Sequence, residues 1–210
     1  VGTIEAINGA SESFHVGERV AAYPLLSCGH CFACRSGRPN ACQSLNLLGI
    51  DAPGGLAEFV YCSLDVLFHV PNDVPGPIAA LAEPLAVALR AVHQAQAATM
   101  DRAVIFGAGP IGLLVGLVLQ DAGASTIIVS DIDPSRLQIA RQMGFLTVNS
   151  AKDALEAYVF DRTNGDYADI VFECSGAAPA AAQVTRVCRV AGTICIVAMH
   201  ATPPPVRLLD

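Results

Sequence analysis

The stretch from Arg102 to Gly123, RAVIFGAGPIGLLVGLVLQDAG, joins a short apolar run to a longer one through a glycine-rich turn. Residues 102–106 predict a buried strand, because four apolar residues follow Arg102 and lead directly into glycine. A helix is expected from Pro110 onward, since proline suits the first helical turn and an apolar stretch of helical length follows it. The stretch therefore predicts a strand, a tight turn and a helix, which together begin a βαβ unit.

The same alternation of short apolar runs and helical stretches continues along the chain. We expect five strands, over 102–106, 126–130, 146–148, 168–173 and 193–199, and helices over 110–123, 134–144, 154–160 and 177–192. Alternation of this kind implies right-handed crossovers and a parallel sheet. Residues 99–210 are therefore predicted to form an α/β domain, a Rossmann-type doubly wound parallel sheet that lacks its last strand.

Gly107, Gly109 and Gly112 form the pattern G-x-G-x-x-G, which alone is weak evidence because glycine-rich turns are common. Here the pattern opens a predicted helix, and Asp131 ends the next strand nineteen residues beyond Gly112. The first glycine permits the tight bend, the second lets the backbone approach a pyrophosphate, and the third lets the helix pack close to the sheet. Because the N–H groups of the helix start can bind phosphates, a dinucleotide site is predicted.

Asp131 indicates which dinucleotide is bound. A carboxylate at the end of the second strand can accept hydrogen bonds from the hydroxyls of the adenosine ribose. The same charge repels a 2′-phosphate, and the next residues, Ile132, Asp133 and Pro134, include no cation that would attract one. NAD is therefore expected rather than NADP.

From Val1 to about His69 the sequence is strand-like and broken by turns. Glycine, proline and asparagine separate short apolar runs, which favours a compact β structure. A helix is expected over 83–96, with Pro84 in its first turn and Glu83 at or near its N-cap, because the residue before a proline avoids helical geometry. The apolar runs of the first part lie at 1–7, 19–26, 54–62 and 66–71.

Four of the eight cysteines lie within fifteen residues in the segment 27–42, SCGHCFACRSGRPNAC. The segment has no predicted helix or strand, so something other than an apolar core must fix its shape. Four thiolates this close can complete a tetrahedral zinc site with no open position, which is structural rather than catalytic. The predicted ligands are Cys28, Cys31, Cys34 and Cys42.

Other interpretations of this segment are weaker. A redox pair needs two cysteines rather than four, and an iron–sulfur cluster, which the ligand type allows, needs no dinucleotide fold behind it. His30 could replace one cysteine, although a solvent-facing loop residue is the simpler interpretation. The remaining cysteines lie in apolar contexts and are interpreted as buried small hydrophobes: Cys62, Cys174, Cys188 and Cys195.

Composition excludes two classes of partner. The formal net charge of −7 argues against nucleic acid, whose binding depends on lysine and arginine. No apolar run approaches the roughly 18 residues of a membrane span. The first residues, VGTIEAINGASESF, lack the basic end and apolar block of a signal peptide, so a cytoplasmic location is expected.

Six segments, in this order, resemble the zinc-containing medium-chain alcohol dehydrogenases, and most closely the sorbitol, threonine and butanediol dehydrogenase branch. They are the four-cysteine loop, GGLAEFV at 54–60, AALAEPLAVALRAV at 79–92, GAGPIGLL at 107–114, DIDPSR at 131–136 and DIVFECSGA at 169–177. The resemblance covers essentially the whole chain. It implies a partial GroES-like catalytic domain over 1–98, with a structural zinc loop at 28–42, followed by the NAD-binding domain over 99–210.

The resemblance also implies roles for single residues. Glu83, in a Glu-Pro pair, matches the acidic residue at the catalytic zinc, either as a ligand or holding the metal-bound water. Without the resemblance it would be interpreted as a capping carboxylate stabilised by the helix dipole. Val197 to Met199 match the strand end that meets the nicotinamide. The implied coenzyme contacts are the three glycines, Pro110, Ile111, Asp131, Arg136, Val197, Ala198 and Met199.

The other catalytic zinc ligands of this family, a Cys in a G-x-C-G segment and the His-Glu of a G-H-E segment, lie upstream of the matched region. The chain begins at Val1 without them, and it stops before the last strand of the family's sheet, so we expect an internal fragment of a longer dehydrogenase. The other histidines have no cysteine or carboxylate at metal-ligand spacing: His15, His69, His93 and His200.

The activity implied by the resemblance is NAD-dependent, zinc-dependent oxidation of a secondary alcohol, with polyols expected first, to a ketone by hydride transfer. The expected partners are a small alcohol or polyol and further copies of the chain in a homodimer or homotetramer. One alternative is a non-catalytic NAD-binding module with a structural zinc. Another, a zinc-ribbon protein that binds nucleic acid, is disfavoured by the net charge and the glycine motif.

Overall fold

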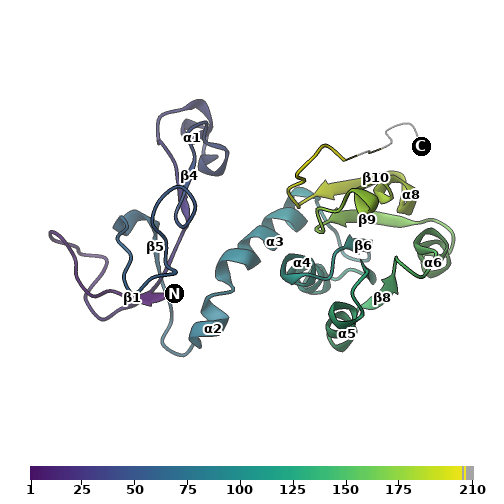
Figure 1. Cartoon of the computed structure of the whole chain (residues 1–210), viewed down its shortest axis with the longest axis horizontal. Helices are drawn as coiled ribbons and strands as arrows, with labels where there is room; N and C mark the ends of the chain where they lie inside the picture. Colours follow the sequence, from purple (N-terminus) through teal and green to yellow (C-terminus); the bar gives the residue numbers. More distant parts are fainter. Residues whose placement is uncertain (205, 207–210) are drawn as a thin grey trace. The chain divides into compact units, whose positions relative to one another are not determined.

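The computed structural model describes residues 1–204 and 206. The chain forms two compact units, Val1–Glu83 and Pro84–Asp210 (Figure 1), and each has its own apolar core. No helix of the described residues is long and apolar enough to cross a membrane.

The first unit is built on small antiparallel sheets, in agreement with the broken apolar runs. A core of Ile4, Phe14 and Val20 supports them. Two single helical turns, η2 (Leu64–Val66) and α2 (Gly76–Ala79), belong to the same unit. The strand β2 (Arg19–Ala22) lies between β1 (Gly2–Thr3) and β5 (Leu67–His69), and β3 (Leu25–Leu26) pairs with β4 (Asn46–Leu47).

Residues 54–62, GGLAEFVYC, form no strand, so that part of the strand prediction is wrong. The side chains of Leu56, Phe59 and Tyr61 are exposed. An apolar run becomes a strand when a neighbouring strand takes up its backbone hydrogen bonds, and none of the described strands pairs with this run.

The second unit holds a five-stranded sheet in which all neighbouring strands are parallel, as predicted. Its spatial order is β10-β9-β6-β7-β8. The chain enters the sheet at the central β6, continues through β7 to β8 at one edge, and then adds β9 and β10 on the other side of β6. A doubly wound sheet opens a ligand crevice at such a reversal, outside the carboxyl ends of its strands. The strands are β6 (Arg102–Phe106), β7 (Thr126–Asp131), β8 (Leu146–Asn149), β9 (Ala168–Glu173) and β10 (Cys188–Ile196).

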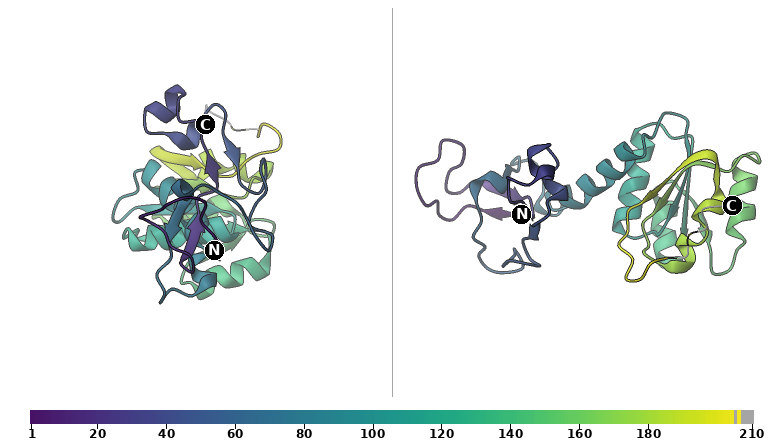
Figure 2. Two further views of the ribbon diagram at one scale, coloured as in Figure 1. Left: turned by 90° about the vertical axis from the view of Figure 1, so that its left-hand side faces the viewer. Right: turned by 90° about the horizontal axis from the view of Figure 1, so that it is seen from above.

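Helices cover both faces of this sheet (Figure 1 and Figure 2). They are α3 (Ala82–Gln94), α4 (Pro110–Asp121), α5 (Pro134–Gln142), α6 (Leu155–Arg162) and α8 (Val184–Val187). Alternate residues of a strand point to opposite faces. Ala103 and Ile105 of β6 accordingly join the core cluster of α3, α4 and α5, whereas Val104 and Phe106 join that of α6 and α8.

The helix predicted over 177–192 is wrong in its second part. Two four-residue helices form, α7 (Ala178–Ala181) and α8, and β10 begins at Cys188. Ala191 has a φ of 59°, which an α-helix does not allow, and the pairing of β10 with β9 shifts register between Cys188 and Thr193. At its other end β10 stops at Ile196, before the predicted limit of 199.

The helix α3 lies where the predicted domain boundary and the structural units differ. The sequence assigns residues 1–98 to the first domain, but Ala88, Ala91 and Val92 of α3 belong to the core cluster of the second unit. Packing alone does not show where an independently folding domain ends, so the domain assignment stays a prediction.

Candidate functional site

The sulfur atoms of Cys28, Cys31, Cys34 and Cys42 all lie within 4.8 Å of one another. The Sγ–Sγ distance is 3.5 Å between Cys31 and Cys34, 3.9 Å between Cys31 and Cys42, and 4.0 Å between Cys28 and Cys34. A tetrahedral zinc ion with bonds of about 2.3 Å places its sulfur ligands roughly 3.8 Å apart. The predicted four cysteines therefore come together with the spacing of one ion.

Short helical turns bring these sulfurs together, although no helix is predicted there. The single turn α1 (Phe32–Arg35) follows Cys31, and the 3₁₀ turn η1 (Pro39–Ala41) precedes Cys42. Residues three apart on such a turn face the same side. Backbone N–H groups also donate to the sulfurs, from Cys28 and Ser44 to Cys42 at 3.3 Å each and from Cys31 to Cys28 at 3.4 Å.

The pKa values of these thiols move in opposite directions. Backbone hydrogen bonding, led by Cys34, lowers the pKa of Cys31 to about 6, whereas desolvation raises the pKa of Cys34 to about 11. Thiols this close to one another cannot all lose their protons unless a cation neutralises the negative charge. Zn²⁺ deprotonates the thiols that it binds, so this donor set fits zinc. His30 is exposed and its Nδ1 contacts the carbonyl of Cys28 at 2.8 Å, outside the sulfur cluster.

The other four cysteines are only partly buried, so the prediction of buried side chains is wrong for them: Cys62, Cys174, Cys188 and Cys195. Three of them, Cys174, Cys188 and Cys195, still pack against the apolar clusters of the second unit. Burial raises the pKa of Cys174 to about 12, so this thiol is protonated at neutral pH.

The glycine-rich turn between β6 and α4 has the shape that its sequence predicts. Gly107 has a φ of +101°, and an added Cβ there would stand 3.1 Å from Cα of Ser175. A Cβ on Gly112 would lie 1.9 Å from the carbonyl oxygen of Gly107, so only glycine lets α4 approach the turn this closely. At Gly109, the N-cap of α4, a Cβ would meet no atom within 4 Å. The turn therefore has open space beside the free N–H groups of the helix start.

Asp131 lies beside this turn, at the end of β7. Its Oδ2 accepts a hydrogen bond from the N–H of Ala108 at 2.7 Å, which sequence reasoning did not foresee. Its Oδ1 accepts the N–H groups of Ile132 at 2.7 Å and Asp133 at 2.9 Å. A carboxylate has about four acceptor positions, so one remains for a further donor.

Arg136 and Ile111, both expected to contact the coenzyme, differ in exposure. Arg136 is exposed on α5, with Nε 3.8 Å from Oδ2 of Asp133. Asp133 caps α5, and hydrogen bonds from the hydroxyl and N–H of Ser135 hold its pKa below the usual range. Ile111 is partly buried against the core of the unit.

Glu83 lies inside the first turn of α3, in helical conformation, although the following proline predicts a non-helical backbone there. Its side chain is exposed. Within residues 1–204 and 206, no hydrogen bond or ion pair involves its carboxylate, and the four cysteines are the only grouping of three or more candidate metal ligands. Its role at a catalytic metal stays a prediction.

Sequence reasoning missed Glu173 and His200. Glu173, at the end of β9, is fully buried, and its Oε1 accepts the N–H groups of Ser175 at 3.0 Å and Gly176 at 3.1 Å together with the Ser175 hydroxyl. Its Oε2 lies 3.0 Å from Nε2 of His200, whose side chain is 9% exposed. His200 follows Val197 to Met199, the segment expected at the nicotinamide, so these residues belong to the same edge of the sheet.

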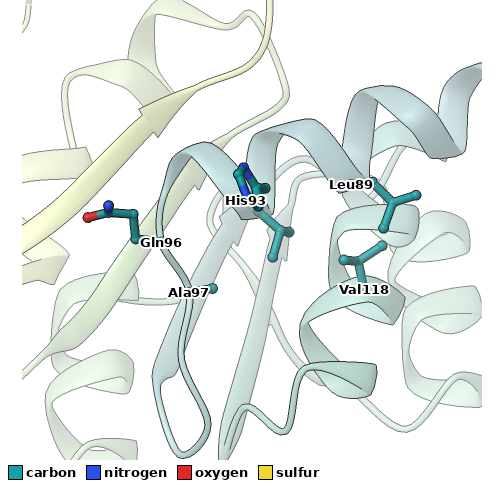
Figure 3. Close-up of a pocket in the computed structure, with 6 residues that line it drawn as sticks. Leu89, His93, Gln96, Ala97 and Val118 are labelled. Atoms are coloured by element: carbon teal, nitrogen blue, oxygen red, sulfur yellow. The ribbon is translucent and has the colours of Figure 1, made fainter.

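Two hollows of the described residues lie away from these residues. The larger, of about 450 Å³, is an apolar depression on α3 and α4 that is drawn in Figure 3. No residue predicted to bind metal or coenzyme lines it or the second hollow, which includes Asp169 and Arg189. The larger hollow is lined by Leu89, Val92, His93, Gln96, Ala97 and Val118.

Two family descriptions match the chain. Residues 1–72 match the alcohol dehydrogenase GroES-like domain, and residues 110–210 match the zinc-binding dehydrogenase family. The chain is 38% identical over 209 residues to 2-dehydro-3-deoxy-L-galactonate 5-dehydrogenase of Pseudoalteromonas atlantica, covering 100% of this chain and 61% of that protein. The chain thus spans about three fifths of the length of that relative.

Solved structures agree with this similarity. A protein described as a zinc-binding dehydrogenase from Sinorhizobium meliloti 1021, bound to NADP, has a TM-score of 0.91 and 32% identity over 99% of this chain and 61% of its own. A short chain alcohol dehydrogenase from E. coli CFT073, complexed with NADH, has a TM-score of 0.90 and 29% identity over 98% of this chain and 61% of its own. Nicotinamide dinucleotides of both kinds therefore occur on this fold.

Proposed function

Because the chain belongs to the zinc-containing medium-chain alcohol dehydrogenases, we propose that the protein oxidises a secondary alcohol to a ketone with NAD. The described residues supply a structural zinc site and most of a coenzyme site. The observation that carries the proposal is the glycine turn at the switch point of the sheet, with open space at Gly109 and the Asp131 carboxylate beside it.

Zinc has a structural role in this proposal. Four thiolates fill a tetrahedral site, so the ion has no open position for a substrate and instead fixes the loop 28–42. For a second, catalytic zinc, Glu83 is the proposed contributor. Among the described residues Glu83 has no companion ligand that would complete such a site with it.

In this proposal the coenzyme contacts four parts of the second unit: the start of α4, the end of β7, α5 and the segment 197–199. The N–H groups at the start of α4 bind the pyrophosphate, and Asp131 accepts a ribose hydroxyl with its remaining acceptor position. Arg136 and Ile111 flank the adenosine, and Val197, Ala198 and Met199 receive the nicotinamide ring, which accepts the hydride. The negative charge of Asp131 favours NAD over NADP, because a 2′-phosphate would be placed beside it.

The substrate class rests on similarity alone. The relative from Pseudoalteromonas is named as a dehydrogenase of 2-dehydro-3-deoxy-L-galactonate, a hydroxylated sugar acid. We propose a polyhydroxylated secondary alcohol as the substrate. A non-catalytic NAD-binding module with a structural zinc is the second candidate, since the four cysteines and the glycine turn would serve it equally.

Titration of the chain with NADH and NADPH tests the coenzyme proposal. NADH should bind at least about tenfold more tightly, which corresponds to about 1.4 kcal/mol. Asp131→Asn keeps an oxygen for the N–H of Ala108 but removes the charge, so it should reduce the preference. Asp161→Asn, which removes a carboxylate that is exposed on α6, is the matched control. Equal affinity of the unchanged protein for both coenzymes would contradict the role of Asp131.

A further inference from the structure

Glu173 makes hydrogen bonds to two segments that lie far apart in the sequence: the loop after β9 and the segment after β10. Its backbone carbonyl accepts the N–H groups of Val197 at 2.9 Å and Ala198 at 3.0 Å. Its buried side chain is bonded within the loop that follows β9 and also to His200, which lies beyond β10. The contact between the loops is close, because a Cβ on Gly176 would stand 3.0 Å from the carbonyl oxygen of Met199.

The position of these loops follows from the strand order. In the proposed coenzyme site, adenosine at Asp131 would lie over the end of β7, and the pyrophosphate would lie beside β6 at the start of α4. The rest of an extended dinucleotide would then pass to the other side of β6, where the strand order places β9 and β10. The loop after β9 borders the glycine turn directly, since Cα of Ser175 lies within 3.1 Å of a Cβ placed on Gly107.

His200 is the nearest hydrogen-bond partner of the second carboxylate oxygen of Glu173. A buried carboxylate needs hydrogen bonds on both oxygens, because an unpaired buried charge is strongly unfavourable. Oε1 has three donors from its own loop, whereas Oε2 has His200 at 3.0 Å and only a longer contact, 3.3 Å, with the N–H of Gly176. The ring of His200 therefore holds the residues just before it against β9.

We propose that His200 is a positioning residue for the coenzyme: by donating from Nε2 to buried Glu173, it holds Val197 to Met199 in the conformation that receives the nicotinamide ring. His200 acts through Glu173 and does not touch the coenzyme. The inference rests on the proposed function, because it requires that the protein bind NAD.

Paired titrations with NADH and ADP-ribose test this role, because ADP-ribose has the adenosine, pyrophosphate and ribose but no nicotinamide. His200→Leu should weaken NADH binding about tenfold or more, which is the effect of losing a hydrogen bond to a charged group. It should change the affinity for ADP-ribose by no more than about twofold. The fluorescence of bound NADH should also shift toward that of free NADH. His200→Gln, whose amide can donate to Glu173, should restore most of the affinity.

His93→Leu, a matched change on α3, should alter neither titration. Equal weakening of both ligands by His200→Leu, or unchanged NADH binding, would overturn the inference, as would a glutamine variant no better than the leucine variant. If the leucine variant does not fold, Glu173→Gln replaces it, with selective loss of NADH in support and equal loss against. An unchanged protein that binds neither ligand overturns the proposed function and this inference with it, whereas equal affinity for the two ligands overturns this inference alone.

Discussion

Gly109 and Gly112 allow the coenzyme role of the glycine turn to be separated from its structural role. An alanine Cβ at Gly112 would lie 1.9 Å from the carbonyl oxygen of Gly107, whereas at Gly109 it would meet nothing within 4 Å. Gly109 has a φ of −76° and a ψ of 177°, which alanine adopts without strain. Gly109→Ala should therefore keep the fold and block the pyrophosphate, whereas Gly112→Ala should disturb the fold.

The expected magnitudes follow from these contacts. Since the blocking atom at Gly112 is backbone, we take the upper end of the overpacking cost, about 3 kcal/mol, of which alanine's better helix propensity returns about 1 kcal/mol. A net loss of about 2 kcal/mol should lower the Tm by roughly 8 °C in a unit of this size. Gly109→Ala should lower the free energy of unfolding by only about 0.5 kcal/mol, because Gly109 is an N-cap, and yet weaken NADH binding at least about tenfold.

Thermal unfolding by circular dichroism, without ligand, and a fluorescence titration with NADH measure the two effects. Gly55→Ala is the control, because a Cβ there meets nothing within 4 Å and lies in the first unit. A folded Gly109→Ala variant that binds NADH as well as the unchanged protein would refute the phosphate role of the turn. A Gly112→Ala variant with unchanged Tm would refute the close approach of α4.

Two further predictions concern the zinc loop and an ion pair. Metal analysis should find about one tightly bound zinc per chain, and Cys34→Ser should lose it, because a tetrahedral structural site needs all four thiolates; a folded serine variant that retains the full metal content would contradict this. The hydrogen bond from Arg102, with Nε 2.9 Å from Oδ2, holds the pKa of Asp169 well below its usual range. This pair stabilises the fold above the unfolded pKa of about 3.9, and the contribution is lost as the pH falls toward the folded value. Arg102→Met should therefore lower the free energy of unfolding by about 2 kcal/mol at pH 7 and by less at pH 3 in denaturant titrations, and equal losses at both would contradict the assignment.

The parts of the fold that the sequence predicted correctly depend on local chemistry. The start of α4 is set by Pro110 and by glycines whose bends and contacts lie within a few residues of one another. The four cysteines lie in one short loop, so their spacing alone predicts that they can meet around one ion. Such features are readable because the interacting groups are neighbours in the chain.

The errors concern pairing between distant segments. Residues 54–62 have the composition of a strand, but a strand requires a partner that periodicity cannot supply. The start of β10 is the opposite case. Its residues have a helical pattern, but they form a strand because Cys188 pairs with Ala168. Pairing with a distant strand, which β10 has and which none of the described strands gives to residues 54–62, therefore decided the structure against local propensity in both places.

Once the strand order is known, the hydrogen bond between Glu173 and His200 can be predicted from the sequence. Glu173 ends a run of buried residues and the loop that follows it donates mainly to Oε1, so Oε2 needs a donor from beyond a neighbouring strand. The neighbours of β9 are β6 and β10. After β6 come Gly107, Ala108 and Gly109, which carry no polar side chain, whereas His200 is the first polar side chain after β10. The sheet topology thus identifies the partner that sequence spacing alone could not, because the two residues are 27 positions apart in the chain.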